Sequence, residues 1–251
     1  MGEQTQHIDV LMYHSISDAG GPTSIPRQVF SDQMNALAET GYHVADFVDL
    51  VAWRDGQRKL PDKTAIVTFD DGFLDFRDTA WPILNKLGFP ATVFLPTDCM
   101  GGYENWNGAN HPPRQLMSWS DIGALYKDGA RFGSHSQNHA NLTQLAKEGL
   151  SLQLRQSRGN LEDALGEPVD AFAAPYGAVN EGVLSAIAEY YDIAAGTRLG
   201  RTDAAVDIFD VPRLEMHYFR DIALWRKYLE GKAERYLTIR KFARNIRRAF
   251  H

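Results

Sequence analysis

Short apolar runs alternate with longer amphipathic stretches along the chain, and this alternation restricts the fold more than any other feature of the sequence. Seven runs are predicted as strands, at 9–13, 64–69, 91–95, 130–134, 171–174, 192–196 and 211–216. Helices are predicted between them at 28–41, 74–87, 119–128, 142–165 and 180–191. Strands separated in this way by helices are typical of a parallel sheet, so the sequence predicts an α/β fold. We expect one large domain, because 251 residues can enclose a single sizeable core.

Polar residues follow several of the predicted strands directly. His14 follows the first strand, Asp70 and Asp71 follow the second, and His135 and His139 follow the fourth. In barrels of parallel strands the carboxyl ends of the strands meet at one mouth, where the site forms. We therefore expect these side chains to converge on one pocket.

The stretch GSHSQNHANL contains the residues most suited to hold a metal. His135 and His139 are four residues apart, which would bring both imidazoles to one side of a helical turn. Two imidazoles and a carboxylate are a common ligand set for catalytic zinc, so Asp71 is the predicted third ligand. Asp70 would then remain as a general base for metal-assisted hydrolysis. Two simpler interpretations stay open, namely polar loop histidines and an aspartate turn before a helix.

Three segments, TFDDG, HSQNH and FAAPYG, resemble in order and separation the polysaccharide deacetylases, also called NodB-homology proteins or carbohydrate esterase family 4. The resemblance runs from about residue 8 to about residue 217 and includes LMYHSI, LMSW and VPRLEM. It implies a distorted (β/α) barrel of about seven parallel strands over residues 1–220 and hydrolysis of an N-acetyl, O-acetyl or N-formyl group on a sugar. It also implies a divalent metal, usually Zn²⁺, although the ligand types do not exclude Co²⁺, Ni²⁺ or Mn²⁺.

The roles that the resemblance implies fall on particular residues of this chain. Asp70 would be the base, and Asp71, His135 and His139 the metal ligands. Tyr176 would offer its backbone N–H to the oxyanion, and Tyr176 and its neighbour Pro175 are predicted to contact substrate. These implied roles agree with the interpretation drawn from the residues alone.

The sequence departs from the family pattern where an arginine usually pairs with the catalytic base. Ala173 of FAAPYG stands at the matching position. We expect Arg213 of VPRLEM to supply the guanidinium from a neighbouring strand end.

A second departure concerns the general acid, which the family usually takes from a Leu-x-x-His segment near the end of the domain. Here that spacing occurs near the beginning, at Leu11 to His14, which resembles a circularly permuted branch of the family. We expect His14 to protonate the leaving amine and Leu11 to line the pocket for the acetyl methyl group. His217 is the rival general acid, and a structural role for His14 is the simpler alternative.

Aromatic side chains in the long stretch 97–119 are candidates for stacking on a sugar. This stretch is too long for a tight connection and is expected to shape a cleft. Trp119, which closes it, is the predicted substrate contact, with Trp106, Tyr103 and Tyr176 nearby. The remaining tryptophans, Trp53, Trp81 and Trp225, are predicted to pack in the core.

The C-terminal part, 221–251, is predicted to form a basic amphipathic helix beside an acidic body. Residues 226–251 hold nine Lys/Arg and two Asp/Glu, a net charge of +7, whereas the whole chain has a net charge of −6. Within 235–250 the predicted apolar face is formed by Tyr236, Ile239, Ala243, Ile246 and Phe250. Such a helix could bind an anionic membrane surface, or it could pack on the acidic body or on a second subunit. Nucleic acid is not an expected partner, because no recognition module accompanies the basic stretch.

The sequence therefore favours a metal-dependent hydrolase that removes an N-acetyl or N-formyl group from an amino sugar during assembly of cell-envelope polysaccharide or glycolipid. A lipid-linked sugar is one form of substrate that this function would include. The alternatives are a carbohydrate O-acetyl esterase and a carbohydrate-binding protein without catalysis. A single cysteine, Cys99, and an N-terminus without an apolar leader predict a cytoplasmic protein, and the basic tail would allow it to bind peripherally to the inner face of the plasma membrane. The oligomeric state is left open.

Overall fold

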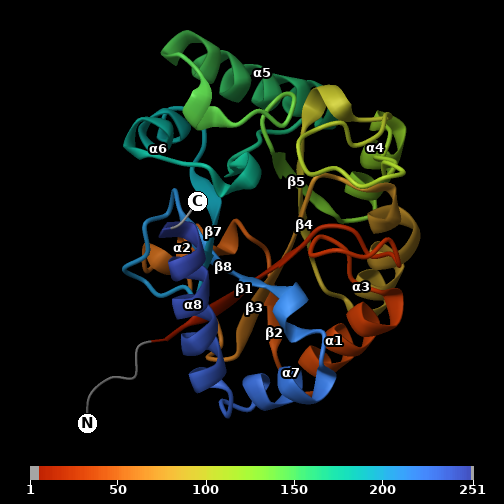
Figure 1. The fold of residues 1–251 in the computed structure, drawn as a ribbon, viewed down its shortest axis with the longest axis vertical. Helices are drawn as coiled ribbons and strands as arrows, with labels where there is room; N and C mark the ends of the chain where they lie inside the picture. The colour runs from red at the N-terminus through yellow and green to blue at the C-terminus, as the bar shows by residue number, and fades with distance from the viewer. Residues whose placement is uncertain (1–5, 250–251) are drawn as a thin grey trace.

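Seven parallel strands close into a barrel in this structure, a computed structural model that describes residues 6–249 (Figure 1). The strands of the ring are β1 (Ile8–Tyr13), β3 (Thr64–Asp70), β4 (Thr92–Leu95), β5 (Arg131–Ser134), β6 (Ala171–Ala173), β7 (Ile193–Leu199) and β8 (Val211–Glu215). The first strand closes the ring, because β1 pairs with β3 along its whole length and with β8 at its end. The predicted parallel barrel is confirmed.

An eighth strand, β2 (His43–Ala45), pairs with the first half of β3 outside the ring. The short helix α2 (Asp49–Arg54) follows it. The sequence pattern predicts neither element, because a strand of three residues is too short to show an alternation of polar and apolar positions.

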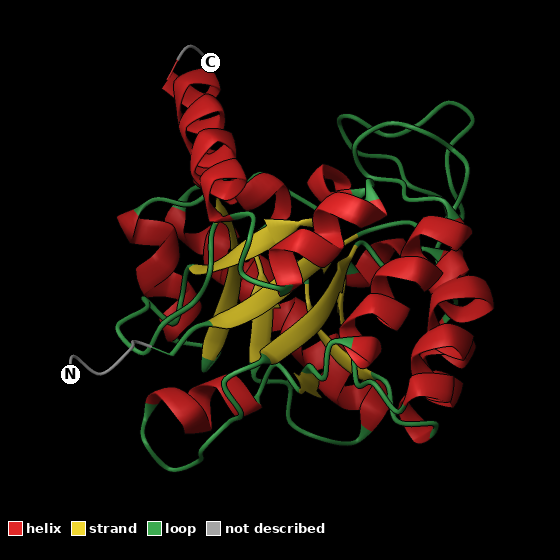
Figure 2. Ribbon diagram, turned by 90° about the horizontal axis from the view of Figure 1, so that it is seen from below, coloured by secondary structure: helices red, strands yellow, loops and turns green. Residues whose placement is uncertain are grey.

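Helices surround the barrel (Figure 2). Their bounds are α1 (Arg27–Glu39), α3 (Trp81–Leu87), α4 (Trp119–Lys127), α5 (Lys147–Leu165), α6 (Glu181–Ala188), α7 (Ile222–Leu229) and α8 (Glu234–Ala249). Two predicted helices begin differently: α3 is preceded by a π-helical turn at Phe76–Ala80, and α5 by a 3₁₀ turn at Leu142–Gln144. None of the described helices combines the length and the apolar character needed to span a membrane.

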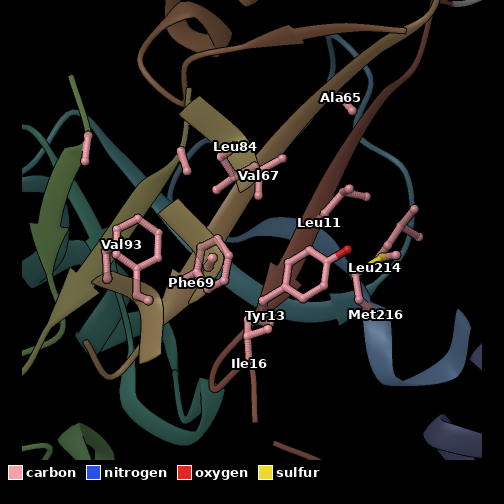
Figure 3. Packing of buried hydrophobic residues seen from close by; sticks show 14 of the residues in the cluster. Leu11, Tyr13, Ile16, Ala65, Val67, Phe69, Leu84, Val93, Leu214 and Met216 are labelled. Atoms are coloured by element: carbon pink, nitrogen blue, oxygen red, sulfur yellow. The ribbon is translucent and has the colours of Figure 1, made fainter. Parts of the chain in front are cut away.

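Strand residues alternate between two separate apolar layers, because successive side chains of a strand point to opposite sides. Residues such as Val10, Ile66 and Phe94 form a cluster that fills the barrel. Their neighbours Leu11 and Val67 belong to the layer between the strands and the surrounding helices (Figure 3). The phase of this alternation decides which polar side chains reach the mouth of the barrel.

The predicted division of the chain at residue 220 falls just before α7, which packs on α1. Trp225 is fully buried, and its Nε1 donates a hydrogen bond of 3.1 Å to the carbonyl of Gln33. Trp53 and Trp81 are also buried, which confirms the core prediction for all three tryptophans.

Helix α8 packs on the barrel at its beginning and projects from it toward the C-terminus (Figure 2). Leu237 is buried against the barrel, whereas Ile239 and Phe242 have exposed fractions of 57% and 68%. Lys241 and Arg244 are half-buried.

Along α8, Ile239 and Ala243 face solvent, whereas Lys241 and Arg244 turn toward the barrel. The packing of the helix on the acidic body, one of the open alternatives, is present in the structure. The side chain of Ile246 and the whole of Phe250 lie outside the described part of the chain.

Candidate active site

Asp70 is the last residue of β3 and lies inside the mouth of the barrel. There Arg213 of β8 binds its carboxylate. Arg213 Nη1 donates to Oδ1 and Nη2 to Oδ2, each at 2.7 Å. The same guanidinium donates to Thr68 Oγ1 at 3.1 Å and to the carbonyl of Gly196 at 2.8 Å. Burial alone would raise the pKa of Asp70, but the charge and hydrogen bonds of Arg213 hold that pKa below its usual value. Arg213 therefore supplies the guanidinium expected beside Asp70.

Asp71, His135 and His139 are buried together beside Asp70, and their ligand atoms lie within 4.8 Å of one another. Asp71 Oδ1 lies 3.4 Å from His135 Nε2 and 3.2 Å from His139 Nε2. A tetrahedral zinc site with bonds of about 2.1 Å has ligand–ligand distances of about 3.4 Å, so these three atoms fit such an ion.

Two further observations support a metal at this position. Asp71 Oδ1 is buried and accepts no hydrogen bond from the described residues, an arrangement that is costly unless a cation satisfies it. His135 Nδ1 lies 2.7 Å from the carbonyl of Ala173, which fixes the proton on Nδ1 and leaves the Nε2 lone pair free. The donor set therefore fits a divalent metal, although it does not identify which one.

The two histidines converge through a tight turn, and the predicted helical turn is wrong. Ser136 and His139 have positive φ angles of 63° and 58°, as does Asp71 at 76°. Such angles are uncommon outside glycine and concentrate at functional sites. Gly72 follows Asp71 with a φ of 71°, and a Cβ there would lie 2.5 Å from a methyl group of Leu95.

A pocket of about 310 Å³ opens above these residues, and His14 lies in its wall. His14 Nε2 is 3.9 Å from Asp70 Oδ2. The loop that carries His14 is held by Asp75, which accepts hydrogen bonds from Ser15 Oγ at 2.6 Å and from the N–H of Ile16 at 2.8 Å. The rival histidine, His217, lines a neighbouring cavity.

Met12 lines this pocket in the place expected for Leu11. Leu11 is fully buried in the layer outside the barrel, so its predicted contact with an acetyl group is wrong. The cause is the two-residue period of β1, because a strand that points His14 inward also points Met12 inward. The alternation of inward and outward residues along β1 could therefore have been recognised in the sequence.

The aromatic wall of the pocket comes from Trp106 and Tyr176. The Trp106 ring stacks on the His139 ring with centroids 4.3 Å apart, and the Tyr176 ring meets His139 edge-on at 4.6 Å. Trp119 begins α4 and lines a different cavity, so its predicted contact with substrate is wrong. Pro175 is buried beneath Tyr176 and is not part of the pocket wall either.

A buried ion pair that the sequence analysis missed organises the long loop that carries Trp106. Arg114 donates to Glu104 Oε1 at 2.7 Å and to Oε2 at 2.8 Å. Arg114 also donates to Ser24 Oγ at 3.0 Å and thereby ties this loop to the one that follows β1. Ten residues separate Glu104 from Arg114, and that spacing gives no helical or strand signal by which the pair could be recognised.

Comparison with known proteins agrees with this geometry. A family profile described as polysaccharide deacetylase matches residues 57–192, which include Asp70 and the three predicted metal ligands. Over 184 residues the chain is 26% identical to a putative polysaccharide deacetylase, YxkH, of Bacillus subtilis, covering 73% of this chain and 62% of that protein. It is 24% identical to the poly-β-1,6-N-acetyl-D-glucosamine N-deacetylase of Staphylococcus epidermidis, covering 65% of this chain and 57% of that enzyme. The chain thus spans less than two thirds of the length of these relatives.

Solved structures share the fold. The Streptococcus pyogenes deacetylase PplD, in complex with acetate, superposes with a TM-score of 0.73 at 24% identity and covers 84% of this chain and 92% of its own. IcaB from Ammonifex degensii superposes with a TM-score of 0.75 at 22% identity and covers 89% and 98%. The permuted chain order inferred from His14 stays a prediction. Because the family profile covers more than half of the sequence, this chain belongs to the polysaccharide deacetylase family.

Proposed function

We propose that this protein is a metal-dependent hydrolase that removes the N-acetyl group, or an N-formyl group, from an amino sugar of a cell-envelope polysaccharide or glycolipid. One observation carries the proposal: a buried Asp-His-His cluster with ligand spacing lies beside an aspartate held ionised by a buried arginine. Enzymes named for deacetylation of N-acetylglucosamine polymers among the relatives support this substrate class.

Asp71, His135 and His139 would hold the metal, with Zn²⁺ as the proposed ion and Co²⁺, Ni²⁺ or Mn²⁺ as alternatives. When bound, the metal supplies a Lewis acid that polarises the acyl carbonyl and makes water a better nucleophile. Asp70 takes the proton from the attacking water, because Arg213 keeps this carboxylate ionised and aimed into the pocket.

Residues of the pocket wall have the remaining catalytic and substrate-binding roles. His14, 3.9 Å from Asp70, donates a proton to the leaving amine. The backbone N–H of Tyr176 stabilises the negative charge that develops on the acyl carbonyl oxygen. The rings of Tyr176 and Trp106 provide apolar surface on which a sugar can stack.

Acetate release from chemically matched sugars tests the proposal. The zinc-loaded protein is expected to release acetate from N-acetylglucosamine oligomers, and both a chelator and Asp71→Asn are expected to abolish release. Asp78→Asn, an exposed aspartate in the helical segment that follows Asp71, is the matched control. Faster release from an O-acetyl sugar than from the N-acetyl sugar would favour an esterase. Tight oligomer binding with no release of acetate or formate would favour a binding protein.

We also propose that α8 contacts an anionic membrane surface, where a lipid-linked substrate would be presented. Ile239 and Phe242 are exposed on the projecting helix, and Arg235 is exposed nearby. Flotation with anionic lipid vesicles is expected to recover the intact chain, and to recover less of an Ile239→Asp/Phe242→Asp variant. Equal recovery of both proteins would contradict this proposal.

A further inference from the structure

A second cavity of about 310 Å³ adjoins the candidate active site, and Arg244 of α8 lines both spaces. The cavity lies between the turn after β8 and helix α8. Its described lining residues are His217, Tyr218, Arg240, Ala243 and Arg244. The side chain of Arg244 therefore contacts both the pocket around Asp70 and this cavity.

Two guanidinium groups of this cavity have no described anion beside them. Arg244 Nη1 is buried and makes no hydrogen bond within the described chain. Arg240 is held in position by rings, because its guanidinium lies 5.0 Å over the ring of Tyr218 and its Nε donates to Tyr236 Oη at 3.0 Å. Among the described residues, no carboxylate oxygen lies within 4.0 Å of a nitrogen of either guanidinium.

His217 adds a third unpaired group. Its Nδ1 is buried without a hydrogen-bond partner among the described residues. Burial, together with the charges of Arg220 and Arg240, lowers the pKa of His217 and favours its neutral form. A neutral imidazole in this position can still donate one hydrogen bond.

Glu215 reaches the active-site pocket from β8, and the positive charge of Arg244 acts on its carboxyl group. It forms no ion pair with Arg244, and burial raises the pKa of its carboxyl group. Glu215 therefore competes weakly with an external anion. Buried polar groups are nearly always satisfied in native proteins, so an unpaired guanidinium nitrogen indicates a ligand.

We infer that this cavity binds a phosphate group carried by the amino-sugar substrate next to the acyl group that is removed. The inference rests on the proposed function and narrows its substrate class. Two guanidinium groups and an imidazole offer more donors than the two oxygens of a carboxylate can accept, whereas a phosphate ester presents up to three free oxygens. Arg244, which lines both spaces, links recognition of the phosphate to placement of the acyl group.

The first test compares N-acetylglucosamine 1-phosphate with N-acetylglucosamine on the full-length chain. Calorimetry without added metal is expected to give a dissociation constant at least about tenfold lower for the phosphorylated sugar, as a charged hydrogen bond would provide. With zinc, the ratio of kcat/KM for the phosphorylated sugar to kcat/KM for the neutral sugar is expected to exceed about ten. Arg244→Ala should reduce both preferences by about tenfold, and Arg244→Lys should restore part of them. Arg155→Ala, which removes an exposed arginine of α5, should change neither.

The phosphate could come from a soluble sugar phosphate or from a lipid carrier, and a third substrate separates these sources. If N-acetylglucosamine on polyprenyl phosphate in micelles is deacetylated faster than the soluble phosphate, the carrier is a lipid; the reverse order indicates a soluble sugar phosphate. Equal binding of phosphorylated and neutral sugars, or a preference that survives Arg244→Ala, overturns the inference. Because binding is measured without turnover, an inactive protein would contradict the proposed function and still leave the phosphate site tested.

Discussion

Removal of the Arg213 guanidinium is the most direct perturbation of the proposed base. Arg213 donates four hydrogen bonds, two of them to Asp70, and its side chain is fully buried. Arg213→Met keeps much of the volume but leaves a buried carboxylate without its cation. Loss of one partner from a buried ion pair costs about 3–5 kcal/mol, and we expect the free energy of unfolding to fall by about that amount.

The pH dependence of stability and of kcat/KM shows in which direction Arg213 shifts the pKa of Asp70. In the intact protein Arg213 lowers the pKa of Asp70, so the pair stabilises the fold above the pKa of an unfolded aspartate and loses this contribution as the pH falls through the folded value. Without Arg213, burial dominates and raises the pKa of Asp70. Asp70 then takes up a proton at a higher pH. The acidic limb of the pH profile of kcat/KM should therefore shift to higher pH. Since a positioned base contributes about 10²–10⁴-fold, kcat/KM at pH 7 should fall within that range.

Urea unfolding and acetate release between pH 4 and 9, both with zinc, measure these effects. Arg213→Lys should be intermediate, because lysine keeps the charge and loses the two-pronged contact. Arg213→Met combined with Ala173→Arg should recover part of the activity, since Ala173 faces the same barrel interior. If Arg213→Met folds and turns over substrate with an unshifted acid limb, the assignment of Asp70 as a base held by Arg213 is refuted.

Three other substitutions test the rest of the site. Asp71→Asn should lower bound zinc, measured by elemental analysis of dialysed protein, by at least about tenfold, and full zinc occupancy would exclude Asp71 as a ligand. His14→Gln should reduce kcat by about 10²-fold, whereas His43→Gln on β2 should leave kcat unchanged; an unchanged kcat in His14→Gln would assign the acid elsewhere. Trp106→Ala should raise KM for N-acetylglucosamine oligomers by about tenfold, as a lost stacking surface would, and an unchanged KM would remove Trp106 from the substrate site.

The sequence predicts the barrel well because its strands are buried and its polar residues fall where strands end. Asp70 and His135 were recognisable for this reason, since each lies at or directly after an apolar run. Arg213 was recognisable only through the resemblance, because an arginine inside a strand carries no signal of its partner. The pairing partner stands 143 residues away in sequence.

The errors have different physical causes. Trp119 begins α4 and lines a different cavity, whereas Trp106 lies on the loop that the buried pair of Glu104 and Arg114 holds in place. The orientation of α8 also depends on tertiary contacts. A helical pattern places Ile239 on an apolar face, but it does not show that Ile239 faces solvent while Lys241 and Arg244 turn toward the barrel.

The pairing of β1 with both β3 and β8 has a consequence for how this protein is synthesised. When the ribosome has made the metal-binding residues, the nascent chain still lacks β8, and the ring cannot close until residues near Leu214 emerge to meet Leu11. Until then Asp70 has no cation beside it and the barrel interior is open to water. A chain that stops before Arg213 would contain every proposed metal ligand and yet remain unable to complete its fold, so quality control can distinguish truncated products from finished ones by exposed strand edges.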